Sequence, residues 1–214
     1  MLRRTTLSRC SRPVSSTRFE GRPALPHVLV LVAPMTTNRQ YFQLDTMVSG
    51  GELGTERAAL DFAMANTIRH FGFCGCGRPS EDGRIPLRYT VIETESHGPS
   101  EAVFLNVSAS DGTILFDPPP PLYSQKAPLA IASCQRTRRP VLTLQSDFDA
   151  EADAQQLASF LATLRLTSLH FTGPSESEAP GIYKHVSTVL RLVFVSPPRA
   201  AIHGLLVRSE SPPP

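Results

Sequence analysis

The sequence has no long hydrophobic run. Its longest apolar run is residues 28–33 ("VLVLVA"), a strand-sized segment that is far shorter than the roughly 18–20 apolar residues of a membrane span. This excludes a transmembrane helix over the 214 residues, and we predict no membrane partner. The hydrophobic fraction, 41%, is nevertheless large enough to build a buried core in the middle of the chain.

Cysteine is also scarce, with four residues in the whole chain. So few cysteines exclude the disulfide framework of a small secreted protein and favour reduced, intracellular thiols. Cys74 and Cys76 are close enough in sequence to share a metal ion, and His70 is the nearest further ligand. A zinc site usually has four ligands, and nothing nearby supplies the fourth, so we predict no metal site.

Acidic residues are nearly absent from residues 1–26, where Glu20 is the only one. The same segment contains six arginines and many Ser, Thr and Pro residues, a composition typical of a mitochondrial transit peptide or of a disordered leader. The net charge of the whole chain, +2, is too small to indicate a nucleic-acid partner. We predict a leader over 1–43, a folded domain over 44–195 and a Pro- and Ser-rich tail over 196–214. The expected location is cytoplasmic, with a mitochondrial location as the alternative.

Strand-like and helix-like segments alternate within the predicted domain. Short apolar runs predict strands at 46–49, 112–116, 140–145 and 167–173. Apolar residues at helical spacing predict helices over 55–69, 127–138 and 181–194, and another that begins at Asp149 or Asp153 and ends at Arg165. This alternation favours an α/β fold with a parallel, doubly wound sheet flanked by helices.

The loop over residues 48–57, "VSGGELGTER", joins the first predicted strand to the first predicted helix. Ligands of parallel sheets bind beyond the carboxyl ends of the strands, where unpaired N–H groups can hold an anion. Gly50 and Gly51 would let a phosphate approach the backbone, and Arg57 could bind its oxygens. The spacing is neither the dinucleotide fingerprint nor a Walker loop, and two glutamates add negative charge. An ordinary turn is therefore the alternative.

Five segments occur in the order and approximate spacing of one known family: "SGGELGTERAALDFA" (49–63), "CGCGRPSEDGRIPLRY" (74–89), "NVSASDGTILF" (106–116), "KAPLAIASCQRTRRPVLTL" (126–144) and "GPSESEAPGIY" (173–183). Together they resemble the molybdenum carrier family, also described as a circularly permuted YpsA-like branch of the SLOG superfamily. The resemblance implies a Rossmann-like three-layer sandwich that binds a phosphate-bearing, nucleotide-like ligand. In the molybdenum carrier this ligand is the molybdenum cofactor, a pterin whose dithiolene holds the metal.

The resemblance also implies where the ligand would bind. Carried over by motif, the site residues are Gly50, Gly51, Gly54 and Arg57; Arg78, Glu81, Asp82 and Gly83; Asp111, Gly112 and Thr113; and Ser175 and Ser177. The acidic pair after Arg78 could accept hydrogen bonds from ligand hydroxyls or from an amino-pterin ring. Structural alternatives are a solvated turn for that pair, and capping for Asp111 and for the two serines.

The sequence departs from the family pattern in its loops. Glu52, Leu53 and Glu56 stand where the family has glutamine, threonine and aspartate, and Cys76 replaces a lysine. A proline-rich segment, 118–126, replaces a second loop that contains glycine and threonine. In that segment, Ser124 and Lys126 could act as phosphate donors, although the prolines themselves have no N–H group.

The sequence therefore predicts a carrier that binds a phosphorylated pterin or nucleotide-like ligand at the glycine loop without reacting with it. Homo-oligomers are compatible with such a role. One alternative is a hydrolase, although the sequence lacks the Pro-Gly-Gly-x-Gly-Thr-x-x-Glu loop of related SLOG hydrolases and a Gly-x-Ser-x-Gly elbow. Another is a diverged domain that has lost its ligand. We predict no catalytic residues.

Overall fold

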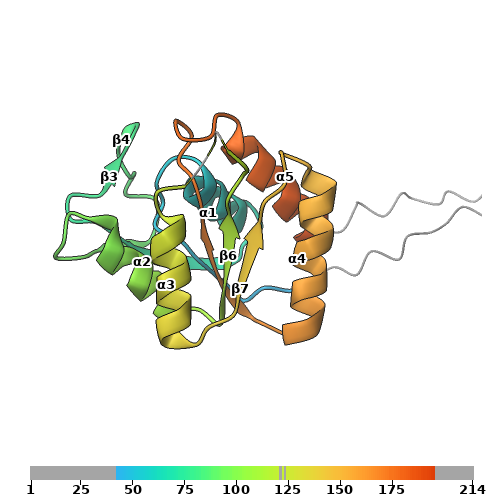
Figure 1. Cartoon of the computed structure of the whole chain (residues 1–214). Coiled ribbons are helices and arrows are strands. Elements are labelled where there is room, and N and C mark those ends of the chain that lie inside the picture. The colour runs from blue at the N-terminus through green and yellow to red at the C-terminus, as the bar shows by residue number, and fades with distance from the viewer. Residues whose placement is uncertain (1–41, 121, 123, 196–214) are drawn as a thin grey trace, which may run out of the picture. The chain divides into compact units, whose positions relative to one another are not determined.

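The central strands of the domain are buried on both faces, so helices must cover each side of the sheet. A computed structural model describes residues 42–120, 122 and 124–195 (Figure 1). The strands are β1 (Thr46–Val48), β2 (Arg69–Cys74), β3 (Pro79–Ser80), β4 (Gly83–Arg84), β5 (Val91–Glu93), β6 (Gly112–Phe116), β7 (Val141–Leu144) and β8 (Ser168–Thr172). The helices are α1 (Thr55–Ala65), α2 (Pro99–Ser108), α3 (Ala127–Thr137), α4 (Ala150–Leu164) and α5 (Ile182–Phe194).

Six of these strands form one parallel sheet in the order β5-β2-β1-β8-β6-β7. The last strand in sequence, β8, thus lies in the middle of the sheet, where Met47 of β1 pairs with His70 on one side and with Leu169 on the other. Strands β3 and β4 form a separate antiparallel hairpin. The predicted α/β, Rossmann-like architecture with a parallel sheet flanked by helices is confirmed.

The helices form two layers, one on each face of the sheet (Figure 1). Helices α1, α4 and α5 share the main apolar core with the central strands, whereas α2 and α3 pack against one another on the opposite face. Helix α5 buries Ile182, Val186, Val189, Leu190 and Val193, an apolar stripe with helical period. None of the described helices combines the length and hydrophobicity needed to cross a lipid bilayer.

The predicted elements match eight elements of the structure, and Asp149 is the residue that caps α4, through a bond from the Ala152 N–H (3.0 Å). The predicted helix over 55–69 is wrong in its last turn, because α1 ends at Ala65 and Arg69 already pairs with β1. Strands β2 and β5, helix α2 and the hairpin were not predicted. The predicted leader and tail, 1–43 and 196–214, lie almost wholly outside the described residues.

Asp111 precedes β6 at the amino edge of the sheet. Its Oδ2 accepts hydrogen bonds from the Thr167 N–H (3.3 Å), the Thr167 hydroxyl (3.2 Å) and the Ser168 N–H (3.0 Å). These bonds tie the beginning of β6 to the beginning of β8, the strand with which it pairs. Asp111 therefore has a structural role at the edge opposite the carboxyl ends of the strands.

We predict that Asp111→Ala lowers the free energy of unfolding by about 1–2 kcal/mol, because three donors lose their acceptor. Urea denaturation of the full chain measures the effect. Asp147→Ala, which removes an exposed aspartate from the loop before α4, is the matched control and should change stability by less than about 0.5 kcal/mol. Equal stability of the two variants would contradict the role assigned to Asp111.

Candidate functional site

A pocket of about 400 Å³ opens at the carboxyl edge of the sheet. Its apolar wall includes Phe73 at the end of β2, Ile85 after the hairpin and Val103 of α2. Its polar lining is Glu52, Glu56, Ser80, Glu81, His97, Asn106, Gln125, Lys126, Ser175, Ser177 and Glu178. Ligands of parallel α/β sheets bind at this edge, and the volume falls within the usual range of small-molecule sites.

The glycine loop in this structure already holds an anion, the carboxylate of Glu56. A Cβ atom on Gly50 would lie 2.6 Å from Glu56 Oε2, so glycine is required there to make room for the carboxylate. The same oxygen accepts a hydrogen bond from the Glu52 N–H (3.2 Å), and Glu56 Oε1 accepts one from the Thr172 hydroxyl (3.2 Å). The space beside Gly50 is therefore occupied by a side chain of α1.

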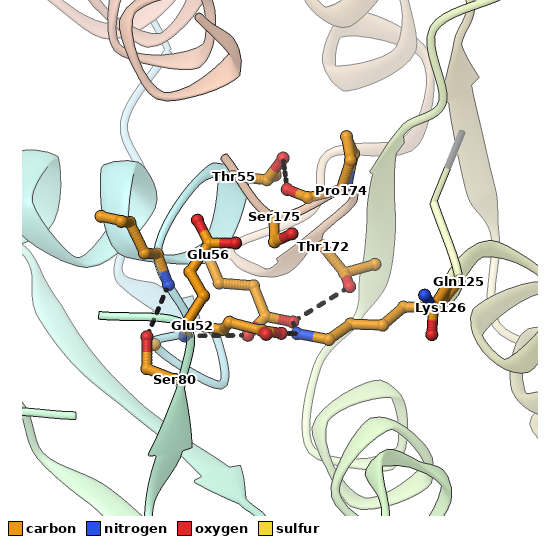
Figure 2. Close-up of polar contacts among 12 residues, drawn as sticks. Glu52, Thr55, Glu56, Ser80, Gln125, Lys126, Thr172, Pro174 and Ser175 are labelled. Carbon is orange, nitrogen blue, oxygen red and sulfur yellow. Dashed lines mark hydrogen bonds and ion pairs between the residues drawn. The ribbon is translucent and has the colours of Figure 1, made fainter. Parts of the chain in front are cut away.

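Lys126 neutralises this buried carboxylate from the other side of the pocket. Its Nζ lies 2.7 Å from Glu56 Oε1 and 2.5 Å from Glu52 Oε2 (Figure 2). Burial alone would lower the pKa of Lys126, but the two glutamates outweigh it and raise the pKa above its usual value. For Glu52, an acid, burial has the opposite effect and raises the pKa, and the nearby Lys126 opposes this rise. One ammonium group thus faces two carboxylates, and the cluster is net negative.

The glycine loop is joined to the loop that follows β8, which we call the serine loop (173–178). Gly54 and Ser175 form an antiparallel bridge, and the Glu176 N–H donates to the Leu53 carbonyl (3.2 Å). Gly54 has φ +112°, and a Cβ atom there would lie 2.7 Å from the carbonyl carbon of Ser175. The glycine at position 54 is therefore explained by the close approach of the two loops.

The hairpin β3–β4 reaches across both loops. Arg57 donates from Nε to the Gly51 carbonyl (2.8 Å) and forms an ion pair with Asp82 (Nη1 to Oδ2, 3.1 Å). At the hairpin tip, both carboxylate oxygens of Glu81 accept from the Ser177 N–H, each at 3.1 Å. The tip of the hairpin is thus connected both to the glycine loop, through Asp82, and to the serine loop, through Glu81.

Arg78, at the base of the hairpin, is enclosed by backbone. Its guanidinium donates to the carbonyl oxygens of Ile85 (3.0 Å), Val91 (2.8 Å), Pro86 (3.1 Å) and Tyr89 (3.1 Å). These four bonds fix the path of the chain between the hairpin and β5. Arg78 is buried and does not line the pocket.

The sequence matches the model of the circularly permuted YpsA SLOG family over residues 47–194. The chain belongs to this family. It is also similar to a crystal structure of a "Putative molybdenum carrier protein" from Syntrophus aciditrophicus SB, with 27% identity and a TM-score of 0.67. The likeness covers 73% of this chain and 98% of that one. No curated protein has a significantly similar sequence.

The strand order locates a switch point in the sheet of this SLOG domain. If α5 were joined to β1 and the chain opened between β5 and β6, the strands of the sheet would follow one another in the order 2-1-3-4-5-6. That order begins like the flavodoxin-like sheet, whose ligand lies at the switch point between its first and third strands. In this SLOG domain those strands are β6 and β8, which are followed by Lys126 and by the serine loop.

The pocket brings together some of the residues that the sequence assigned to the site of this SLOG protein. Gly50, Glu81, Ser175 and Ser177 line it. Gly51, Gly54, Arg57 and Asp82 hold the surrounding loops together, while Arg78 and Gly83 shape the hairpin segment. Asp111, Gly112 and Thr113 lie at the amino end of β6, the opposite edge of the sheet.

Sequence reasoning did not identify the ion pairs of Lys126 with Glu52 and Glu56. A usable signal was present, because Lys126 is one of only two lysines in the sequence and stands directly before a predicted helix.

Among the described residues, no group of three or more His, Cys, Asp or Glu side chains could hold a metal ion. Burial raises the pKa of the Cys74 thiol, which keeps it protonated at neutral pH.

We predict that Lys126→Met destabilises this SLOG domain by about 3 kcal/mol at pH 7, since it leaves the buried carboxylate of Glu56 and the half-buried carboxylate of Glu52 without a cation. Loss of Lys126 removes the cation that opposes burial, so the pKa of Glu52 rises further. When the pKa of an acid is higher in the folded state than in the unfolded state, protonation of that acid stabilises the folded protein. The deficit of the variant should therefore shrink as the pH falls from 7 toward about 5, in urea titrations at each pH.

Lys184→Met is the matched control, because Lys184 is the other lysine and is exposed on α5. It should leave the stability nearly unchanged at both pH values. Adding Glu52→Gln and Glu56→Gln to Lys126→Met should restore part of the lost stability. A deficit that does not depend on pH and is not relieved in the triple variant would contradict the electrostatic origin.

Proposed function

We propose that this protein binds a small pterin or nucleotide-like ligand that carries a phosphate, and that it holds the ligand without reacting with it. The observation that carries this proposal is the pocket of about 400 Å³ at the carboxyl edge of the parallel sheet, beside the switch point between β6 and β8. The molybdenum carrier-like character of the chain, from its family and its structural neighbour, supports this ligand class.

The lining of the pocket matches the parts of such a ligand. A planar ring would pack between Phe73, Ile85 and Val103, which form the apolar wall. Amino and ring N–H groups of a pterin are hydrogen-bond donors, and the carboxylate of Glu52 in the pocket lining is an acceptor. The phosphate would approach Ser175 and Ser177 in the serine loop, because the space beside Gly50 is filled by a carboxylate.

The molybdenum cofactor is the specific cargo that this proposal includes. The pocket fits the organic part of that cargo, with an apolar wall for the ring and polar loops for the phosphate. In that cargo the sulfur atoms of the pterin hold the molybdenum, so this proposal asks for no metal ligand from the protein. The residues of this chain would then bind, orient and shield the cargo.

Mass spectrometry of small molecules released from the purified protein tests the proposal, and a phosphorylated pterin or nucleotide is expected. Addition of the same compound should raise the melting temperature of the free protein, since a ligand specific for the folded state stabilises it. Ser177→Ala should weaken binding by roughly tenfold through loss of a hydroxyl donor. Ser159→Ala, on the exposed face of α4, should not change it. Absence of any retained or stabilising ligand would instead indicate a diverged domain.

Hydrolysis is a second candidate function, favoured by the position of Glu52. This carboxyl group lines the pocket and burial raises its pKa, as in many general acids. Release of base or phosphate from nucleoside monophosphates measures the activity. We expect the wild-type protein to release no more product than Glu52→Gln. A turnover that Glu52→Gln abolishes would replace the carrier proposal with hydrolysis.

A further inference from the structure

Three backbone N–H groups at the rim of the pocket already have carboxylate partners. The Ser177 N–H donates to both oxygens of Glu81. The Ser175 N–H donates to Glu178 Oε2 (2.9 Å), and the Gln125 N–H donates to Glu178 Oε1 (3.3 Å). These are the donors that an incoming phosphate would meet at the switch point between β6 and β8. The protein therefore supplies its own anions at this position.

The two carboxylates differ in how easily a ligand could displace them. Glu178 is half-buried and joins the loop before α3 to the serine loop. Glu81 is exposed at the tip of the hairpin. The hairpin has other anchors, the ion pair of Arg57 with Asp82 and the bond from the Leu53 N–H to Ser80 Oγ (3.2 Å). Glu81 can therefore leave the Ser177 N–H while the hairpin stays in place.

The charge of the pocket makes this contact important for ligand choice. Four glutamates line the pocket, and Lys126 is the one Lys or Arg among its lining residues that the structure describes. Lys126 is already held by Glu52 and Glu56 at 2.5 and 2.7 Å. A phosphate that enters thus meets carboxylates and backbone donors, and each additional negative charge on the ligand adds repulsion.

We propose that Glu81 is a specificity-determining residue of this pocket. Its carboxylate occupies an anion subsite made of the Ser177 N–H and the hydroxyls of Ser175 and Ser177, which lie 3.2 Å apart. A ligand phosphate binds by displacing Glu81, and the remaining glutamates restrict the pocket to ligands with a single phosphate. Di- and triphosphates are excluded by charge. This inference rests on the proposed function and names the ligand class more narrowly.

Titration calorimetry with guanosine, its 5′-mono-, di- and triphosphates and inorganic phosphate tests this inference. Guanine is a suitable probe because it shares the 2-amino-4-oxopyrimidine edge of a pterin. Glu81→Gln keeps the size of the side chain but removes its charge. This variant should bind the monophosphate and inorganic phosphate about tenfold more tightly than the wild type, and its gain in affinity should be larger for the di- and triphosphates. Its affinity for guanosine should stay within about threefold of the wild-type affinity.

Glu176→Gln is the matched control, with the same change of charge in the serine loop. Glu176 does not line the pocket, and its oxygens accept from the Gly181 N–H (2.6 Å) and the Tyr183 N–H (3.0 Å). Its affinities should stay within about twofold of the wild type. Equal phosphate affinities in Glu81→Gln and Glu176→Gln, including undetectable binding in both, would overturn the inference. Mass spectrometry of the small molecules released from the protein tests the proposed function independently of these affinities. Failure of this inference can therefore be distinguished from failure of the proposed function.

Discussion

The structure depends on one buried electrostatic constraint, the contact of Lys126 with Glu52 and Glu56. Glu56 is almost fully buried, and a carboxylate in that position must have a cation and hydrogen-bond donors to offset its loss of hydration. The ammonium group comes from the beginning of α3, and one donor comes from Thr172 at the end of β8. The constraint therefore brings the loops after β1, β6 and β8 to one point at the carboxyl edge of the sheet.

The same constraint explains the character of the pocket. Because the carboxylate of Glu56 fills the space beside Gly50 and accepts the Glu52 N–H, this part of the glycine loop is not open to a phosphate. The serine loop has a similar arrangement, with Glu81 and Glu178 as acceptors. A pocket built in this way is satisfied without its ligand, and a ligand gains binding energy only where it replaces one of these internal contacts. Such a site is compatible with the proposed role of holding and releasing a compound of low charge.

Much of the fold could be predicted from the sequence, because the central strands and the amphipathic helices carry clear periodic patterns. The elements that were missed have weaker local signals. Strand β2 reads "RHFGFC", with Gly72 in its middle, and glycine is unfavourable in an isolated strand. The structure requires that glycine because β1 passes so close that a Cβ atom would overlap the backbone of Ser49. Pairing between strands, a tertiary contact, thus overrides the local preference.

The sequence by itself determined the α/β class, the family and the position of the glycine loop at the head of α1. These depend on periodicity and on motif order, which are properties of the linear chain. Only the tertiary structure decided what each motif residue contacts. Arg57 and Arg78 have the chemistry of phosphate ligands, yet the fold gives them carboxylate and carbonyl partners. Asp111 lies at the opposite edge. The chemistry of a side chain determines which groups it can bind, and the fold determines which of those groups lie within reach.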